Sequence, residues 1–242
     1  MASNGVWRGV RGAGAVAPGE PCIVSGAMAQ GTRGGSGTNF PIVCIGGSAG
    51  GADAYVRLLR HLPVDMNVAI AIVNHFAGGP PQLHEILPNC TGMRVQLITD
   101  GLRVTPNAVF IIPEGHALHV RDGAFQLRPV ARPHGWPDVI TLCLQSLTPH
   151  WRGQLVAVIV SGYDGGGVAA LCGIRDAGGI TIAQELEAAR APGMPASAIA
   201  SGCIDFVLAP EEIAQKIVSI ARWCDDPAVF GVWWGQSHRE RA

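Results

Sequence analysis

The chain has 242 residues, of which 48% are hydrophobic and 14% charged, so it can bury a sizeable core and lies far from the composition of disordered proteins. Its 17 Lys and Arg residues balance 18 Asp and Glu residues, and the net charge of -1 excludes the basic surface of a nucleic-acid binder or of a polybasic membrane-surface protein. No apolar run approaches the roughly 18 residues needed to cross a bilayer, which predicts no membrane insertion.

Residues 1–38 are rich in Gly, Ala and Ser and show neither the period of a helix nor the alternation of a strand. We predict a flexible tail there, a folded domain over 39–224 and a C-terminal extension over 225–242. The amino terminus lacks the apolar run of a signal peptide, and the seven cysteines are scattered without a C-x-x-C pair. This cysteine pattern argues against a disulfide framework and a zinc site, and the two features together predict a cytoplasmic protein.

From Phe40 onward, short apolar runs alternate with longer amphipathic segments, which is typical of an α/β fold. Strands of a parallel sheet, buried on both faces, are predicted at 41–46, 68–74, 155–160, 180–184 and 205–209. Helices are predicted at 54–62, 137–147, 170–178 and 210–223. The segment 108–129 alternates around Asp122-Gly123, which predicts an inserted antiparallel hairpin. The expected fold is a doubly wound, mostly parallel sheet with helices on both faces.

The first predicted strand leads directly into GGSAGG (46–51), which satisfies the G-x-S-x-G pattern of a nucleophile at a strand–turn–helix junction. Ser48 would stand exposed at this turn, where the N–H groups of Ala49, Gly50 and Gly51 could stabilise an oxyanion. A nucleotide-binding turn and a purely structural tight turn are the alternatives. The turn lacks both the Lys-Ser/Thr pair of a P-loop and the G-x-G-x-x-G dinucleotide fingerprint.

Two more polar residues follow predicted strands. His75 leaves the sheet at the same carboxyl edge as Ser48, where open parallel sheets bind ligands, and among eight histidines it alone is placed to act as a general base. Asp164 follows the strand at 155–160 and would orient His75 through its Nδ1–H. The competing interpretations are a structural His75 and an Asp164 that caps the next helix or forms an Asx turn. The order Ser, His, Asp differs from that of ordinary α/β hydrolases.

Four segments together resemble the catalytic domain of the CheB-type chemotaxis protein-glutamate methylesterases. They are IGGSAGG (45–51), NHFAGG (74–79), SGYDGGG (161–167), and TIAQ with PGMPASAI (181–184 and 192–199). The resemblance covers the chain from Phe40 to about Trp223. It implies hydrolysis of γ-glutamyl methyl esters, and deamidation of certain glutamines, on the cytoplasmic helices of chemoreceptors in a phosphorelay pathway. It also implies Ser48 as the nucleophile, His75 as the base, and no metal or other cofactor.

The glycine-rich turn departs from the family pattern. The family usually has Ser/Thr-Gly-x-x-x-Asp-Gly, and a gapless alignment places Gly166 at the position of its catalytic aspartate. Asp164 lies two residues earlier, about 6–7 Å along an extended chain, so it can substitute only if the loop is remodelled. Gly166 therefore predicts a weakened enzyme, because serine, histidine and oxyanion hole retain some catalysis without the acid. The alternative is a receptor-binding module of the same fold with impaired catalysis.

Smaller departures concern substrate contact and regulation. Ala49 replaces a threonine that the family often has beside the nucleophile, and Tyr163, expected near the oxyanion or substrate, replaces a methionine. The family's Arg-Pro-Ser-Val-Asp stretch corresponds to residues 135–139. Many family members carry an amino-terminal receiver domain, whereas we expect a stand-alone domain with a constitutively accessible site. A methyltransferase made as a separate chain is expected in the same pathway.

Overall fold

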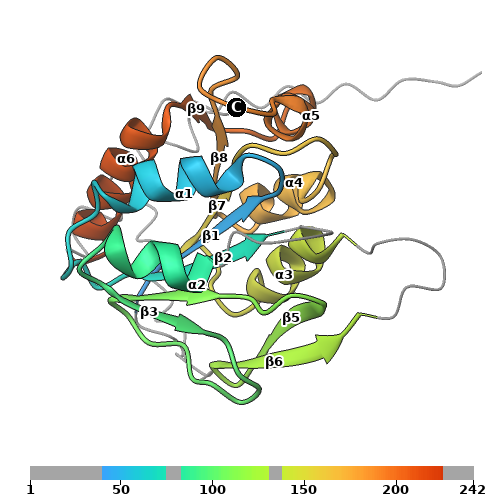
Figure 1. Ribbon diagram of the computed structural model, residues 1–242. Coiled ribbons are helices and arrows are strands. Elements are labelled where there is room, and N and C mark those ends of the chain that lie inside the picture. Colours follow the sequence, from blue (N-terminus) through green and yellow to red (C-terminus); the bar gives the residue numbers. More distant parts are fainter. Residues whose placement is uncertain (1–39, 75–82, 131–137, 226–242) are drawn as a thin grey trace, which may run out of the picture. The chain divides into compact units, whose positions relative to one another are not determined.

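The computed structural model describes residues 40–74, 83–130 and 138–225. Within these ranges, a main sheet of seven strands, all paired in parallel, has the order β3-β4-β2-β1-β7-β8-β9 (Figure 1). The strands are β1 (Ile42–Gly47), β2 (Ala69–Asn74), β3 (Arg94–Leu97), β4 (Ala108–Ile111), β7 (Leu155–Ile159), β8 (Ile180–Gln184) and β9 (Phe206–Leu208). The predicted doubly wound, mostly parallel sheet is confirmed.

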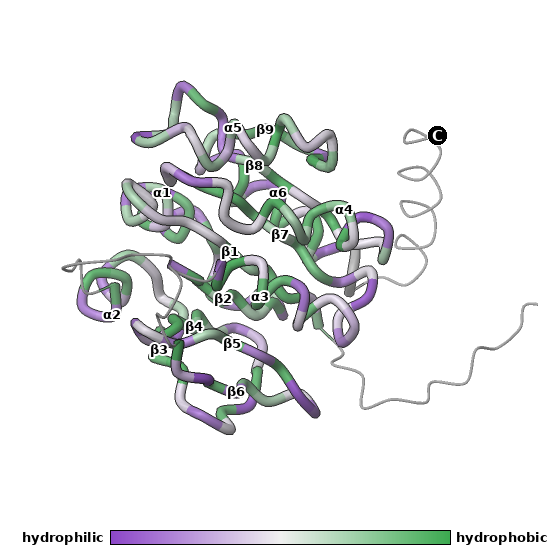
Figure 2. Tube along the Cα trace, turned by 90° about the vertical axis from the view of Figure 1, so that its right-hand side faces the viewer, coloured by the Kyte–Doolittle hydropathy of each residue, from purple (hydrophilic) through white to green (hydrophobic). Residues whose placement is uncertain are grey.

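Helices cover both faces of the sheet. They are α1 (Gly51–Leu59), α2 (Leu83–Ile86), the 3-10 turn η1 (Leu87–Asn89), α3 (Val139–Leu147), α4 (Val168–Asp176), α5 (Gly193–Ala200) and α6 (Pro210–Asp225). Alternate residues of β1 face opposite layers: Val43 and Ile45 pack with α1 and α6, whereas Ile42 and Cys44 pack with α3, α4 and α5. Because both faces are covered, β1, β7 and β8 are buried along their whole length, which explains their continuous apolar runs. Figure 2 shows these central strands largely in the green of hydrophobic residues.

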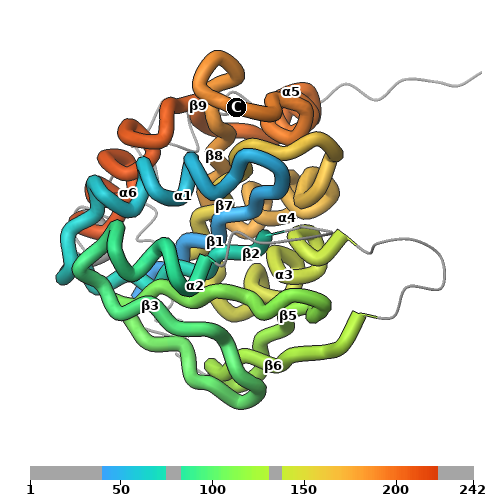
Figure 3. The backbone as a smooth tube through the Cα atoms, in the orientation of Figure 1, coloured from blue at the N-terminus to red at the C-terminus, as the bar shows by residue number. Residues whose placement is uncertain are grey.

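The segment 108–129 differs from the predicted single hairpin. Ala108–Ile111 is β4, a buried strand of the main sheet between β2 and β3, and only β5 (His116–Arg121) and β6 (Ala124–Pro129) form the antiparallel pair. The turn at Asp122-Gly123 is confirmed, because both residues have positive φ (53° and 74°), as a two-residue hairpin turn requires. The hairpin packs on α3, where the Val120 N–H of β5 donates to Ser146 Oγ at 2.8 Å (Figure 3).

Two of the cysteines form a disulfide. Cys172 of α4 is bonded to Cys203, which follows α5, across a sequence separation of 31 residues and with Cα atoms 5.0 Å apart. The inference drawn from the scattered cysteines is therefore wrong for this pair, because α4 and α5 pack together and bring distant residues into contact. Cys44 and Cys143 are buried free thiols with Sγ atoms 3.8 Å apart, and their hydrogen bond raises the pKa of Cys44.

The predicted domain boundaries stay predictions. The tail at 1–38 lies outside the described residues, and so does the C-terminal extension beyond residue 225. None of the helices in the described ranges is both long enough and apolar enough to cross a membrane.

Candidate active site

The candidate site lies where the strand order of the sheet reverses. On one side of β1 lie β2, β4 and β3, in that spatial order. After these strands the chain crosses over and pairs with the other side of β1 as β7. In an open parallel sheet, the carboxyl ends of the two strands at such a reversal form a crevice in which ligands bind. The turn with Ser48 follows β1 and the loop 161–167 follows β7, so the two predicted motifs meet at this switch point (Figure 3).

Ser48 occupies a tight turn that is held by backbone hydrogen bonds. Its N–H donates to the Ser161 carbonyl at 2.9 Å, and the Gly51 N–H donates to the Ser48 carbonyl at 3.0 Å. Gly50 lies between them in the left-handed region, with φ 76°, as the N-terminal cap of α1. A side chain at this position would be strained, and its Cβ would lie 2.6 Å from Ser161 Oγ and 2.7 Å from Arg190 Cβ. Backbone geometry and close packing thus fix the predicted nucleophile.

The turn offers fewer oxyanion donors than the sequence suggests. The expectation that Gly51 has a free N–H is wrong, because that group donates to Ser48 within the turn. The N–H groups of Ala49 and Gly50 have no acceptor among the residues that the structure describes. The Ala49 carbonyl accepts from Ser161 Oγ at 2.8 Å, and because the peptide is planar and trans, the Gly50 N–H points away from Ser161. Ala49 and Gly50 are therefore the donors available to an oxyanion.

Ser161 connects the turn to two other elements, a role that sequence reasoning did not assign. Its N–H donates to Gln184 Oε1 at 2.9 Å, and its Oγ accepts from the Ala191 N–H at 2.8 Å. Ser161 and Gln184 are two of the few buried polar residues in the described domain. Sequence analysis could have found this role, because Ser161 and Gln184 are polar residues at the carboxyl ends of two apolar strands, β7 and β8. Parallel sheets place functional groups at such ends.

The end of β2 lies beside the nucleophile turn. The strand register pairs Gly47 with Asn74, and these residues directly precede Ser48 and His75. Asn74 Oδ1 accepts from the hydroxyl of Tyr55, a fully buried residue of α1, at 3.1 Å. Burial raises the pKa of Tyr55 well above its ordinary value, so the phenol stays a neutral donor. His75 itself lies outside the described residues, and its role as base stays a prediction.

The loop after β7 carries the acid of the predicted triad. Asp164 is exposed, and its Oδ1 accepts from the Gly166 N–H at 3.3 Å, which is the Asx turn that the sequence left open as an alternative. It does not cap α4, whose N-terminal cap is Gly167 without a side-chain bond. Asp164 Oδ1 also lies 3.4 Å from the position that a Cβ on Gly166 would take. The loop is therefore turned rather than extended, and an oxygen of Asp164 lies next to the point at which a side chain on residue 166 would begin.

Tyr163 stands at the surface of the same loop. Its backbone is anchored through Gly162, whose N–H donates to Ala191 at 2.9 Å and whose carbonyl accepts from the Met194 N–H at 2.8 Å. The residue as a whole is 81% exposed. Such exposure suits contact with an approaching protein substrate better than stabilisation of a shielded oxyanion.

Comparison with known proteins decides the family. The chain matches the CheB methylesterase model over residues 43–217, which is more than half of its length. It belongs to the CheB methylesterase family. Protein-glutamate methylesterase/protein-glutamine glutaminase 2 of Burkholderia orbicola is 33% identical over 213 residues, which cover 85% of this chain and 60% of the relative. The corresponding protein of the group 3 operon of Rhizobium meliloti is 32% identical over 197 residues, 78% of this chain and 54% of its own length.

The likeness to CheB methylesterases extends to a solved structure. The crystal structure of the Thermotoga maritima CheB methylesterase catalytic domain matches with a TM-score of 0.67 and 27% sequence identity, over 75% of this chain and 98% of that domain. The chain spans little more than half the length of the curated CheB methylesterases that it matches. The expected family and fold are therefore both confirmed.

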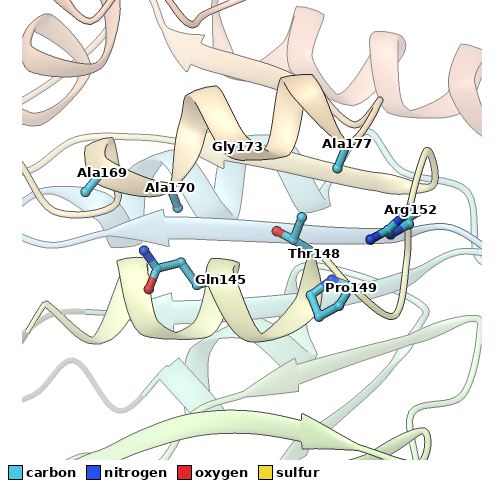
Figure 4. Close-up of a pocket in the computed structure, with 8 residues that line it drawn as sticks. All are labelled: Gln145, Thr148, Pro149, Arg152, Ala169, Ala170, Gly173 and Ala177. Carbon is cyan, nitrogen blue, oxygen red and sulfur yellow. The ribbon is translucent and has the colours of Figure 1, made fainter.

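A separate cavity of about 260 Å³ lies between α3 and α4 of this CheB methylesterase domain (Figure 4). It is lined by Gln145, Thr148, Pro149, Arg152, Ala169, Ala170, Gly173 and Ala177. It shares no lining residue with the Ser48 turn or the glycine loop, so it does not belong to the site described above.

Proposed function

We propose that the chain hydrolyses γ-glutamyl methyl esters on the cytoplasmic helices of methylated chemoreceptors and deamidates certain glutamines there. The relatives are named protein-glutamate methylesterases and protein-glutamine glutaminases, which supports this reaction class. The observation that carries the proposal is the Ser48 turn at the switch point of the sheet, where the Ala49 and Gly50 N–H groups have no acceptor among the described residues and the Gly50 N–H points away from Ser161. The ester substrate is a side chain of a protein, and in this proposal the exposed Tyr163 contacts the receptor helix that carries it.

The reaction proceeds through an acyl-enzyme. Ser48 Oγ attacks the ester carbonyl carbon while His75 takes the hydroxyl proton, and the oxyanion accepts hydrogen bonds from the N–H groups of Ala49 and Gly50. The tetrahedral intermediate expels methoxide, which leaves as methanol with the proton from His75. Water, deprotonated by His75, then attacks the acyl-enzyme, and the glutamate carboxylate is released as Ser48 regains its proton. For a glutamine substrate, ammonia leaves in place of methanol.

Asp164 supplies the acid that orients His75 in this proposal. Its carboxylate oxygen lies 3.4 Å from the Cβ position of Gly166, at the place where the family resemblance puts the catalytic aspartate. The carboxylate would hold the imidazole tautomer that accepts the Ser48 proton and would stabilise the imidazolium that forms. Because Asp164 is exposed, we expect a weaker effect than a buried aspartate would give.

The setting of the reaction is part of the proposal. We propose that the domain acts in the cytoplasm, within a chemotaxis or chemosensory phosphorelay, on glutamates that a separately encoded methyltransferase has methylated. Ester hydrolysis by an activated serine nucleophile requires neither a metal nor an organic cofactor.

Methanol release from methylated receptor helices tests the proposal. We expect Ser48→Ala to lower kcat for methanol release by about 10⁴-fold or more, to the residual level that binding and the oxyanion hole sustain, because the acyl-enzyme forms on Ser48. Ser219→Ala is the matched control: this serine lies on α6 in the layer opposite α3, and its Oγ donates only to the Gln215 carbonyl. Full activity of Ser48→Ala would refute the mechanism.

The alternative function is a receptor-binding module with impaired catalysis, and Gly166 favours it. It predicts that the unmodified chain binds methylated receptor helices in a pull-down or by calorimetry yet releases no methanol. Binding together with Ser48-dependent methanol release would rule this alternative out.

A further inference from the structure

The carboxylate of Asp138 joins two elements that flank the site. It caps its own helix, α3, since Oδ1 accepts from the Thr141 N–H at 2.9 Å and Oδ2 from the Thr141 hydroxyl at 2.5 Å. It also accepts from the Gly167 N–H, with distances of 3.2 Å to Oδ1 and 3.0 Å to Oδ2. Gly167 is the N-terminal cap of α4 and lies in the left-handed region, with φ 86°. One side chain therefore sets both the start of α3 and the end of the glycine loop.

A helix cap alone does not explain the second contact. An N-cap side chain needs only an N–H two or three residues ahead in its own helix, and Thr141 provides it. The bond to Gly167 instead spans 29 residues of sequence and lies next to Gly166, whose Cβ position is 3.6 Å from Asp138 Oδ1. Two successive N–H groups of the loop are thus each held by a carboxylate: Gly166 by Asp164, and Gly167 by Asp138.

Three donors of the protein already contact the Asp138 carboxylate. An ionised carboxylate has about four acceptor positions. The N–H and hydroxyl of Thr141 and the shared N–H of Gly167 make four contacts with the two oxygens. We therefore expect Asp138 to influence the reaction through the groups that it holds.

We propose that Asp138 is a positioning residue for the acid of the site. The Asp138 carboxylate holds the Gly167 N–H and therefore fixes the peptide group between Gly166 and Gly167. The fixed peptide in turn holds Gly166 in the Asx turn that directs the Asp164 carboxylate. The proposal rests on the proposed function of Ser48 and Asp164. Residues 165–167 are three consecutive glycines, which without such an anchor would sample many backbone conformations. Small displacements of a catalytic group are costly, so the anchor compensates for the flexibility of the loop.

Two variants separate the contact to Gly167 from the side-chain contact within α3. Asp138→Ala removes every contact, including the one to Gly167, whereas Thr141→Val removes only the hydroxyl bond within α3. We expect Asp138→Ala to lower kcat for methanol release by about 10- to 100-fold with little change in KM, and Thr141→Val to leave kcat within about twofold. Asp138→Asn keeps one acceptor oxygen and should recover part of the loss. Equal effects of Asp138→Ala and Thr141→Val on kcat would overturn the proposal.

A double-mutant cycle tests the route through Asp164. If Asp138 acts by directing that carboxylate, Asp138→Ala introduced into Asp164→Ala should lower kcat by less than about twofold further. Full additivity of the two losses would overturn the proposal. Because Asp138→Ala also removes a helix cap, folding is checked by circular dichroism, and Asp138→Asn carries the cycle if the alanine variant does not fold.

A second readout separates failure of this inference from failure of the proposed function. An alkyl fluorophosphonate labels an activated serine: the Ser48 oxygen bonds to phosphorus, fluoride leaves, and the hydroxyl proton passes to the base. Slower labelling of Asp138→Ala and normal labelling of Thr141→Val would support the positioning role even if the unmodified chain released no methanol. Unchanged labelling of a folded Asp138→Ala variant would overturn the positioning role, whatever the substrate of the chain proves to be.

Discussion

The two strand ends that form the site are built in opposite ways. The turn after β1 is fixed by close packing: a Cβ on Gly47 would meet the Tyr55 hydroxyl and would lie 2.8 Å from Val160 Cγ2. The loop after β7 is closely packed at Gly162 and Gly167 but open at Gly165, whose Cβ would meet nothing nearer than 3.9 Å, and carboxylates accept hydrogen bonds from the Gly166 and Gly167 N–H groups. The turn keeps the glycines and the serine of the family pattern although Ala49 departs from it, whereas the loop departs at Gly166, where the Asp164 and Asp138 carboxylates already lie close to the Cβ position.

The helices behind the two strand ends are anchored differently as well. Arg57 of α1 donates two hydrogen bonds to Glu211 of α6, at 2.7 and 2.8 Å, and this pairing lowers the pKa of Glu211. Both side chains are about one third exposed, so the ion pair adds only a small share of the stability. On the other side of the sheet, α4 is tied covalently through Cys172 to Cys203. The helix behind the glycine loop thus has a covalent tie, whereas the helix behind the Ser48 turn has an ion pair.

The largest expected effect concerns the acid of the glycine loop. Asp164→Ala should lower kcat for methanol release by about 10²- to 10⁴-fold, the range set by loss of the aspartate in serine-protease triads and by the exposure of this carboxylate. Methanol release under saturating methylated receptor helices measures the change. Full activity of Asp164→Ala would show that the loop does not carry the orienting acid, and the comparison of the two strand ends would lose its functional meaning.

Moving the carboxylate from position 164 to position 166, where the family has its aspartate, also tests the role of Asp164. Gly166→Asp alone should not raise kcat, because its Cβ would lie 3.4 Å from Asp164 Oδ1 and 3.6 Å from Asp138 Oδ1, which crowds three carboxylates together. Gly166→Asp combined with Asp164→Gly removes one of them and should recover activity lost in Asp164→Gly. A large gain from Gly166→Asp alone would mean that the unmodified site lacks an effective acid.

The sequence predicts local features of the site better than it predicts long-range contacts. The position of Ser48 follows from a buried apolar run that ends in GGSAGG, and strand, turn and helix are confirmed there. The hydrogen bond from the Gly167 N–H to Asp138 joins elements far apart in the chain. A helix-capping aspartate has the same sequence pattern whether or not it makes such a long-range bond, so the sequence does not predict it. The extended-chain distance does not describe this loop, because an Asx turn folds the Asp164 side chain toward Gly166, and the role of Asp164 as the acid stays a prediction.

Other errors have similar causes. Ala108–Ile111 was assigned to the hairpin because short apolar segments next to an alternating pattern do not reveal which sheet they join. The Cys172–Cys203 bond requires α4 and α5 to pack together, which spacing alone does not indicate. The donors of the Ser48 turn were overcounted, since the Gly51 N–H is used inside the turn. In each case the missing information is a tertiary contact rather than a local propensity.

The disulfide gives the next largest expected effect. Replacing Cys172 and Cys203 with serine should lower the free energy of unfolding by about 3.7 kcal/mol, because the bond closes a loop with a sequence separation of 31 residues in the unfolded chain. Denaturant unfolding measures the loss. Cys90→Ser, which changes a half-buried free thiol, is the control and should stay within about 0.5 kcal/mol. Equal thiol titres of the unfolded chain with and without reductant would show that the bridge does not form.

The smallest effect compares a single added methyl group at the two strand ends. Gly47→Ala should cost about 1–3 kcal/mol and lower kcat, because the new Cβ meets buried Val160 and the Tyr55 hydroxyl and must displace the turn that holds Ser48. Gly165→Ala meets nothing nearer than 3.9 Å and should change the free energy of unfolding by no more than about 0.5 kcal/mol. Thermal and denaturant unfolding of both variants measure the contrast. Equal costs at the two positions would mean that packing does not distinguish the nucleophile turn from the glycine loop, and the retention of the family pattern at one and its loss at the other would need a different physical cause.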